Sequence, residues 1–245
     1  MSTFYVKNEQ IIENKINILD EDVNHIKNVL RYKIDDKLDV CDENGTRYKT
    51  IIENFEKDKV ILNILEISNE TTECKINITL YQGLPKSDKM DLIVQKCTEL
   101  GVKEIVPVVS ERVIVKLDDK NEAKKQERWQ KIAKEAAKQS GRQIVPNVKN
   151  AINLKNIIEN LSKYDIVIVP YECEKEHNIK NILRNISNTK DIAIIIGPEG
   201  GFSENDIEIL NEVENLKKVS LGPRILRTET AGLATLAMVI YELDY

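Results

Sequence analysis

The stretch from Ile192 to Ala237 constrains the fold of this chain most, because it places the same kind of turn after two short predicted strands. The apolar run IAIII (192–196) leads into Gly-Pro-Glu-Gly-Gly, and the strand predicted around KKVS (217–220) leads into Leu-Gly-Pro-Arg. A run that is apolar at each position predicts a strand buried on both faces, as in a parallel sheet covered by helices. Glycine lets a ligand approach the backbone closely. Loops at the carboxyl ends of such strands commonly bind ligands, so we expect an α/β fold with a ligand site here.

The composition fits a globular protein and excludes several classes. With 245 residues, one large or two modest domains are possible, and 41% hydrophobic with 31% charged residues argues against wholesale disorder. No apolar run approaches the roughly 20 residues that span a bilayer, and the N-terminus MSTFYVKNEQ lacks the apolar core of a signal peptide. The formal net charge of -5 does not indicate nucleic-acid binding, although a local basic face is compatible with it.

The cysteines and histidines give no metal-binding pattern. The four cysteines contain no CxxC pair, and the chain has only two histidines. We therefore expect no metal site and reduced thiols, as in a cytoplasmic protein.

Residues 1–70 predict a small β-rich, barrel-like domain with one helix. A helix is expected from Asp20, as its cap, to Arg31, because apolar residues recur at helical spacing. Strands are expected at Phe4–Val6, in a hairpin around Asn44-Gly45, and at Lys59–Ile67. His25 and Arg31 lie on or beside the helix, either as a packed histidine and a surface arginine or as RNA contacts.

Residues 71–245 predict an α/β domain, since the pattern changes to alternating strands and helices after the polar segment Asn69–Glu73. Ser87 is expected to cap a helix that ends at Gly101. The expected strands lie at 75–81, 104–109, 165–169 and 192–196, and the expected helices at 87–100, 121–141, 154–161 and 179–186.

The long helix at 121–141 carries cations three or four residues apart. This spacing puts them near one face, which is either a solvated surface or an RNA contact. Trp129 on the same helix is expected to pack in the core. The cations are Lys124, Arg128, Lys131, Lys134, Lys138 and Arg142.

The two glycine loops lack the signatures of known phosphate sites. The chain has neither GxxxxGK[ST] nor GxGxxG after a first strand, so a P-loop and a dinucleotide site are not expected. Apolar residues and backbone groups in the second loop suit an adenine-like ring. Ser203 with Asp206 predicts a capping box, and Thr228 predicts a cap of the last helix. The alternative is that the glycines serve only as turns and Thr-Glu only as a cap.

The chain resembles the RsmE family of ribosomal RNA methyltransferases, a branch of the SPOUT superfamily. The similarity rests on IIIGPEGGFSENDIE, SLGPRILRTETAGLATLAMV, HIKNVLR, QGLPKSDKMDLIVQKCTELGV, SERVIVK and ERWQKIAKEAAKQSGRQIVP. The resemblance implies a knotted (trefoil) α/β methyltransferase domain with an N-terminal PUA-like RNA-binding domain. It also implies methylation of N3 of a uridine in 16S ribosomal RNA of the small subunit, S-adenosylmethionine as cofactor, and a homodimer.

The resemblance further implies that three loops hold the cofactor, with Ile196, Leu221, Ile225 and Leu226 lining an adenine slot. RNA contacts are expected from His25, Arg31, Arg112 and Arg142. The cofactor-binding residues implied are Pro170, Tyr171, Glu172, Ile196, Gly197, Glu199, Gly200, Gly201, Leu221, Gly222, Ile225, Leu226, Arg227, Thr230 and Ala231.

Methylation of a uracil imide nitrogen needs either a base or stabilisation of the developing anion. Arg227 is expected to stabilise that anion. Glu199 or Glu229 is expected to be the base, and Glu199 is favoured because a carboxylate in the first turn of a helix, such as Glu229, is explained by the helix dipole.

Other functions remain open from the sequence. One is a non-catalytic RNA-binding assembly factor, although such a protein needs no cofactor slot. A second is an α/β enzyme that uses a nucleotide, which the missing phosphate loops disfavour. The third is a methyltransferase of the same superfamily that acts on transfer RNA.

Overall fold

The chain forms two compact units, and the first is discontinuous in sequence. The computed structural model describes residues 3–86, 88–113 and 119–244, with the side chains of 119–121 left out. Unit 1 comprises Met1–Glu73 and Ala137–Ile144, and unit 2 comprises Cys74–Ala136 and Val145–Tyr245. The predicted helix at 121–141 is found as α3 (Asp119–Ser140), whose last residues belong to unit 1.

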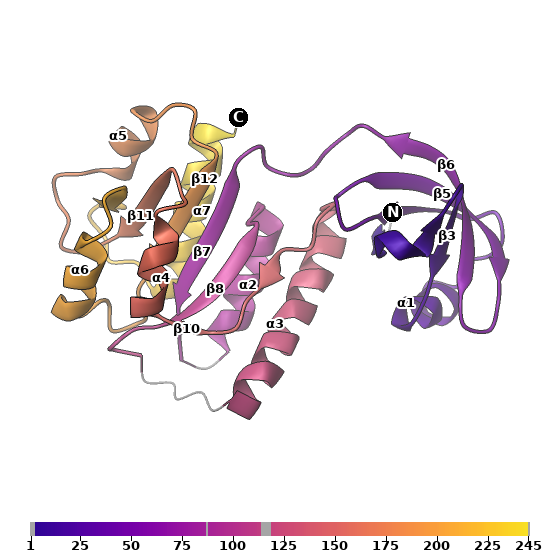
Figure 1. The fold of residues 1–245 in the computed structure, drawn as a ribbon, viewed down its shortest axis with the longest axis horizontal. Helices are drawn as coiled ribbons and strands as arrows, with labels where there is room; N and C mark the ends of the chain where they lie inside the picture. Colours follow the sequence, from indigo (N-terminus) through magenta and orange to yellow (C-terminus); the bar gives the residue numbers. More distant parts are fainter. Residues whose placement is uncertain (1–2, 87, 114–118, 245) are drawn as a thin grey trace. The chain divides into compact units, whose positions relative to one another are not determined.

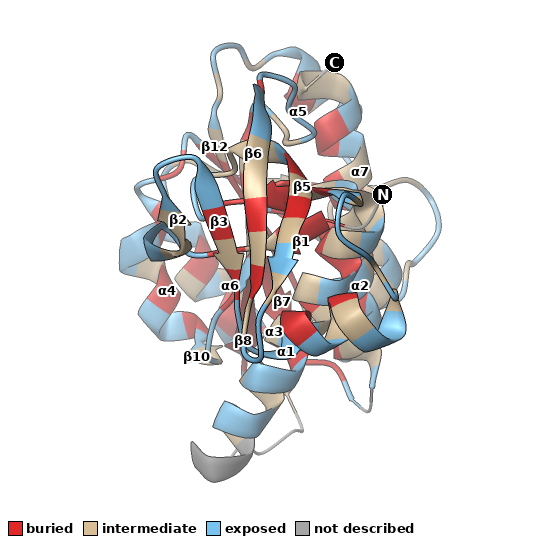
Figure 2. Ribbon diagram, turned by 90° about the vertical axis from the view of Figure 1, so that its right-hand side faces the viewer, coloured by how far each residue is buried: buried red, intermediate tan, exposed pale blue. Residues whose placement is uncertain are grey.

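Unit 1 is built on a curled sheet (Figure 1). Its six strands follow the order β1-β4-β5-β6-β3-β2. The predicted hairpin around Asn44-Gly45 is confirmed, since β4 and β5 pair antiparallel and Gly45 has a φ of 82°. Buried residues alternate with partly exposed ones at residues 50–52 of β5 and 60–62 of β6, so one face of the sheet supplies a core there (Figure 2). The strands are β1 (Thr3–Tyr5), β2 (Ile11–Ile12), β3 (Lys15–Ile18), β4 (Lys37–Cys41), β5 (Arg47–Phe55) and β6 (Val60–Ser68).

The helix predicted from Asp20 is present, but its second half is wider than an α-helix. It starts as α1 (Glu21–Asn24) and continues as a π-helical segment, η2 (His25–Val29). Asp20 lies at the predicted N-cap position, with a backbone φ of 59°. Its side chain makes no capping hydrogen bond. Arg31, just after the helix, also has a left-handed backbone, with a φ of 55°.

Arg142 and Glu73 tie the late segment 137–144 into unit 1. The Arg142 side chain is only 5% exposed, and its Nε donates to Glu73 Oε2 at 3.2 Å. Glu73 also accepts from the backbone N–H groups of Gln143 (2.8 Å) and Ile144 (3.2 Å). Arg47 Nη2 donates to the Gly141 carbonyl at 2.7 Å. A buried guanidinium cannot reach a phosphate, so the predicted RNA contact of Arg142 does not fit, and its role is structural.

Unit 2 has a sheet in which each strand pair is parallel, as the sequence predicts. The order is β10-β8-β7-β12-β11-β13, with the short β9 also paired to β8. The strands are β7 (Asn77–Gly83), β8 (Glu104–Val109), β9 (Asn147–Val148), β10 (Ile152–Asn153), β11 (Ile166–Pro170), β12 (Asp191–Ile196) and β13 (Leu216–Val219).

Helices cover both faces of this sheet (Figure 1). Ile192, Ile194 and Ile196 of β12 pack in one core, against α2, α3, α5 and α7, whereas Ala193 and Ile195 pack in the other, against α4 and α6. Trp129 is 5% exposed in the first core, which confirms its predicted packing role. The helices other than α3 are α2 (Lys89–Leu100), α4 (Leu154–Leu161), α5 (Ile179–Arg184), α6 (Glu204–Asn211) and α7 (Thr228–Leu243).

Two of the predicted helix ends are confirmed and one is wrong. Gly101 follows α2 with a φ of 107°, and Ser203 with Asp206 forms the capping box of α6. The N-cap position of α7 is Arg227, which makes no side-chain capping hydrogen bond, and Thr228 is the first residue of the helix. Ser87 lies outside the described residues. Among the helices that the structure describes, none combines the length and the apolar character needed to cross a membrane.

Removing the Glu73 carboxylate should destabilise unit 1. Glu73→Ala takes the counter-ion from a buried guanidinium and leaves two backbone N–H groups without their acceptor, so we expect the free energy of unfolding to fall by about 3 kcal/mol. Urea denaturation followed by circular dichroism measures the change. Glu66→Ala is the control, because it breaks the exposed Lys49–Glu66 pair of the same sheet and should cost less than about 1 kcal/mol. Equal losses in the two variants would contradict the assignment.

Candidate active site

Three loops that follow neighbouring parallel strands of unit 2 surround one cavity of about 910 Å³. They follow β11, β12 and β13, whose carboxyl ends meet at one edge of the sheet. The volume lies in the range of small-molecule sites. All the predicted cofactor residues line this cavity except Thr230: Pro170, Tyr171, Glu172, Ile196, Gly197, Glu199, Gly200, Gly201, Leu221, Gly222, Ile225, Leu226, Arg227 and Ala231.

The loop after β12 is a tight turn that needs glycine at its end. The Gly201 N–H donates to the Pro198 carbonyl at 2.9 Å, and Gly201 has a φ of 67°. A Cβ atom on Gly201 would lie 2.9 Å from Glu172 Oε1 of the loop after β11. Arg112 Nη1 donates to the Gly200 carbonyl at 2.9 Å. Arg112, predicted to contact RNA, is therefore bound to this turn, with its side chain otherwise exposed.

The end of β7 approaches the same turn, which the sequence did not indicate. A Cβ atom on Gly83 would lie 2.6 Å from Pro198 N and 2.8 Å from Ile196 O, so only glycine allows the two backbones to pack this closely. Gly83 lies two residues after the predicted strand 75–81, and a glycine there was the signal that could have revealed this contact.

Lys89, at the start of α2, joins the two carboxylates predicted to act in catalysis. Its Nζ lies 3.0 Å from Glu199 Oε1 and 3.5 Å from Glu229 Oε2. Glu199 also accepts from the Lys86 backbone N–H at 3.0 Å. Burial by itself would raise the pKa of Glu199, but the hydrogen bonds from Lys89 and the backbone outweigh it and lower that pKa. The hydrogen bond to Glu199 in turn raises the pKa of Lys89.

Glu199 and Glu229 therefore differ in the number of hydrogen bonds that their carboxylates accept. Glu199 is held ionised by several donors, and each donor makes the carboxylate a weaker base. Glu229 Oε2 is buried and makes no hydrogen bond among the described residues, apart from its longer ion pair with Lys89. Glu199 lines the cavity, whereas Glu229 is not among its lining residues, so the preference for Glu199 drawn from the sequence stays a prediction.

The loop after β13 contributes a glycine at positive φ, apolar side chains and a cation. Gly222 has a φ of 114°. Leu221 and Leu226 are partly buried, whereas Ile225 is 88% exposed and so contributes less apolar wall than expected. Arg227 is exposed at the first turn of α7, where its carbonyl accepts from the Ala231 N–H at 2.8 Å. Its guanidinium is available to a ligand in the cavity.

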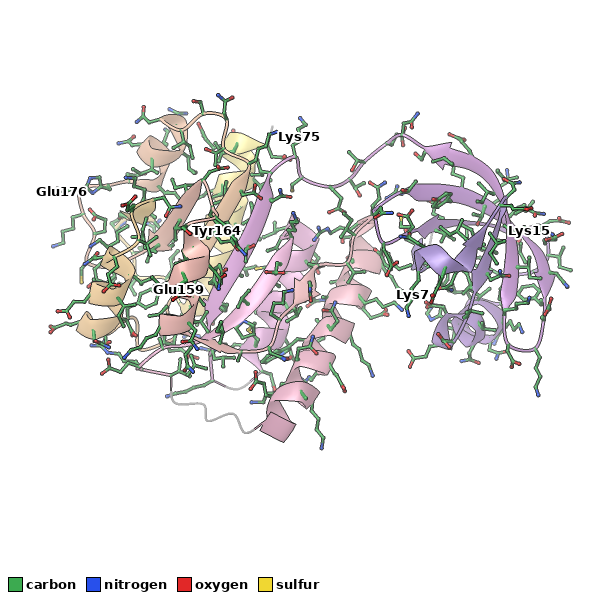
Figure 3. All side chains as sticks on the ribbon, in the orientation of Figure 1. Lys7, Lys15, Lys75, Glu159, Tyr164 and Glu176 are labelled. Atoms are coloured by element: carbon green, nitrogen blue, oxygen red, sulfur yellow. The ribbon has the colours of Figure 1, made fainter. Side chains whose placement is uncertain are left out.

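The loop after β11 is fixed to β13 by a hydrogen bond from the Tyr171 N–H to the Val219 carbonyl, at 3.0 Å. A hydrogen bond between the Tyr171 hydroxyl and the Cys173 side chain raises the pKa of Tyr171. Glu174 and Lys175 line the cavity beside Glu172, so this wall carries two carboxylates and one ammonium group. Glu176 lies at the outer edge of the loop (Figure 3).

Of the predicted RNA contacts of unit 1, His25 starts the π-helical segment and Arg31 follows its end. Arg31 is exposed, and the His25 ring packs edge-on against Phe4 with 6.1 Å between centroids. A left-handed arginine after a π-helical turn is an uncommon backbone arrangement of the kind found at functional sites. Along α3, Arg128 pairs with Asp91 and Lys138 pairs with Asp22, whereas Lys124 and Lys131 are exposed. Part of the predicted cationic stripe is therefore neutralised within the protein.

Comparison with known proteins places this parallel sheet and its loop-lined cavity in the class of RNA methyltransferases. Residues 72–240 match the RNA methyltransferase domain family, and residues 18–65 match the RNA methyltransferase PUA domain. The chain is 39% identical to ribosomal RNA small subunit methyltransferase E of Bacillus subtilis (93% of this chain, 90% of that protein). It is 34% identical to the Aquifex aeolicus protein of the same name (98% and 99%).

Solved structures agree with this similarity over the whole chain. A ribosomal RNA small subunit methyltransferase E from Neisseria gonorrhoeae, bound to S-adenosyl methionine, superimposes with a TM-score of 0.82 at 32% identity (99% of this chain, 98% of that one). A putative methyltransferase from Legionella pneumophila with bound cofactor SAM gives 0.84 at 29% identity (98% and 96%). The chain belongs to the ribosomal RNA small subunit methyltransferase E family, which confirms the predicted resemblance.

The two adjacent glycines of the β12 turn should respond differently to alanine. Gly201→Ala places a side chain at positive φ and against Glu172, so we expect the free energy of unfolding to fall by about 1 kcal/mol. Gly200→Ala is the matched control, because its Cβ would make an ordinary 3.4 Å contact with Arg112 Cβ. Chemical denaturation of the two variants provides the comparison, and equal stability would show that the turn tolerates a side chain at both positions.

Proposed function

We propose that this protein transfers the methyl group of S-adenosylmethionine to N3 of a uridine in 16S ribosomal RNA of the small subunit. The observation that carries the proposal is that the three predicted cofactor loops surround one cavity, in a chain whose family includes a member solved with S-adenosyl methionine. The match to a PUA domain at residues 18–65 supports an RNA substrate.

The cavity residues fit the cofactor chemically. Ile196, Leu221 and Leu226 supply an apolar slot for an adenine ring, and the backbone of the glycine turns supplies hydrogen-bonding groups. Glu172 and Glu174 place negative charge where a sulfonium or an ammonium group would be attracted. When bound, the cofactor supplies an electrophilic methyl group.

The protein's own part in the reaction is to manage charge on the uracil. Arg227, exposed at the cavity, stabilises the negative charge that develops on the uracil oxygens as the N3 proton leaves. Glu199, which lines the cavity and is held ionised by Lys89, is the candidate acceptor of that proton. Of the three predicted catalytic residues, Arg227 and Glu199 thus take chemical roles, whereas Glu229 lies outside the cavity lining and pairs with Lys89.

Residues 1–70 serve as the PUA-like RNA-binding domain and residues 71–245 as the SPOUT methyltransferase domain, whose loops form the implied trefoil knot. His25 and Arg31 on unit 1 and Arg112 on unit 2 are the RNA contacts that we carry forward. Arg31 is the strongest of these, since it is exposed on a constrained turn. The protein acts in the cytoplasm, where its ribosomal substrate is found.

A homodimer is supported by apolar side chains on two helices in contact, α2 and α7. Tyr241 is 76% exposed, Leu92 43% and Met238 39%. Exposed apolar groups of this size commonly lie in protein interfaces. A second copy of the chain packed on α7 would remove them from water.

The test of the proposed function is the transfer of labelled methyl groups to small ribosomal subunits that lack the modification, followed by nucleoside analysis. We expect the label in N3-methyluridine. Label in another nucleoside, or in transfer RNA, would overturn the substrate assignment and keep the enzyme class. Cofactor binding without transfer to either RNA would also reject the substrate, and absence of cofactor binding would favour a non-catalytic assembly factor.

The role of Arg227 predicts a specific kinetic change. Arg227→Ala should lower turnover at saturating substrate by about a hundredfold, because a charge-stabilising group is lost from the transition state. Affinity for S-adenosylmethionine should change little. The control is Lys217→Ala, which removes the same charge from an exposed position on β13. Weakened cofactor binding with normal turnover at saturation would show that Arg227 binds the cofactor instead.

A further inference from the structure

A buried chain of hydrogen bonds connects β7, α7 and the turn after β12. Gln82 is completely buried, and its Nε2 donates to the Gly83 carbonyl at 3.0 Å and to Thr228 Oγ1 at 2.8 Å. Thr228 Oγ1 donates to the Gly197 carbonyl at 2.6 Å. The chain thus ends on the first residue of the Gly-Pro-Glu-Gly-Gly turn that lines the cavity.

The direction of each hydrogen bond in this chain is fixed by chemistry. A carbonyl can only accept, so the Gln82 amide must present its nitrogen to Gly83. Its second N–H then points to the Thr228 hydroxyl, whose single proton is left for Gly197. Pro198 has no N–H, so the peptide between Gly197 and Pro198 is held from its carbonyl side.

Gln82 is an unfavourable choice for stability alone. Its Oε1 is buried and has no hydrogen-bond partner among the described residues. A Cβ atom on Gly232 would lie 3.1 Å from this oxygen, so the helix passes close to it without offering a donor. Leaving a buried carbonyl unsatisfied is destabilising, whereas an apolar group of similar shape can be neutral or stabilising. A local departure of this kind is typical of functional positions.

We propose that Gln82 and Thr228 are positioning residues that hold the Gly197–Pro198 peptide in the orientation that binds the methyl donor. The proposal rests on the proposed function for the identity of that donor. The amide and the hydroxyl do not react; they restrict the turn before the ligand arrives, which lowers the entropy lost on binding.

Thr235 provides a matched control on the same helix. It is also completely buried, and its Oγ1 donates to the Ala231 carbonyl at 2.7 Å within α7. Thr235→Val therefore removes the same group in the same burial as Thr228→Val, without altering a bond to the turn.

The experiment compares Gln82→Leu, Thr228→Val, Thr228→Ser and Thr235→Val in the full chain. Affinity for S-adenosylmethionine is measured by calorimetry, amide hydrogen exchange of residues 197–203 is measured without ligand, and stability is measured by urea unfolding. We expect Thr228→Val and Gln82→Leu to weaken affinity by about tenfold, the equivalent of one hydrogen bond, and to speed exchange in the turn. Gln82→Leu should unfold at the same or a higher urea concentration than the wild type.

A conservative variant, a control variant and a double variant make the test more specific. Thr228→Ser keeps the hydroxyl and should retain wild-type affinity, and Thr235→Val should change stability without changing affinity or exchange in the turn. The double variant Gln82→Leu/Thr228→Val should lose no more affinity than either single variant, because both act through one chain.

The proposal is overturned if turn exchange in Thr228→Val and Gln82→Leu matches the wild type, or if Thr235→Val loses affinity to the same degree. Wild-type protein that does not bind S-adenosylmethionine would refute the proposed function instead. Exchange in the ligand-free turn would still decide whether Gln82 and Thr228 position it.

Discussion

The parallel register of four neighbouring strands determines where this protein can place a ligand. Backbone hydrogen bonds pair Ile196 with Gln82 and Pro170 with Val219, so β7, β12, β11 and β13 end at the same edge. The loops that follow must then meet, and their glycines let them do so without side chains in the way. The apolar faces of the sheet are both covered by helices, which leaves this edge as the place where backbone groups face a ligand.

The chemistry at that edge depends on which charged side chains of unit 2 pair with one another and which stay exposed. Lys89 pairs with two carboxylates, and Arg112 binds the backbone of the turn that carries one of them. These contacts come from α2 and from the segment after β8, so the turn is held from both sides. Arg227 differs, because it is exposed at the cavity and can respond to charge on a substrate.

The sequence predicted the elements whose pattern is local and missed what depends on distant partners. Strand β8 (Glu104–Val109) and helix α4 (Leu154–Leu161) were found at their predicted bounds because apolar periodicity defines them. The short strands β2, β3, β9 and β10 carry too few residues for a pattern. Lys89 lies 110 positions from Glu199 and Gln82 lies 146 from Thr228, so spacing could not reveal either pair. The cation pattern that included Arg142 could not show that Arg142 is buried and paired with Glu73. The predicted knot, domain limits and site roles stay predictions.

The discontinuity of unit 1 has a consequence for the order in which the chain can fold as it is synthesised. An N-terminal domain generally folds first as it leaves the ribosome. Here the last part of unit 1, residues 137–144, is made only after two strands of the unit 2 sheet, β7 and β8. The ion pair between Glu73 and Arg142 therefore cannot form until after β7 and β8 have been synthesised. The nascent chain cannot finish unit 1 before it has begun unit 2.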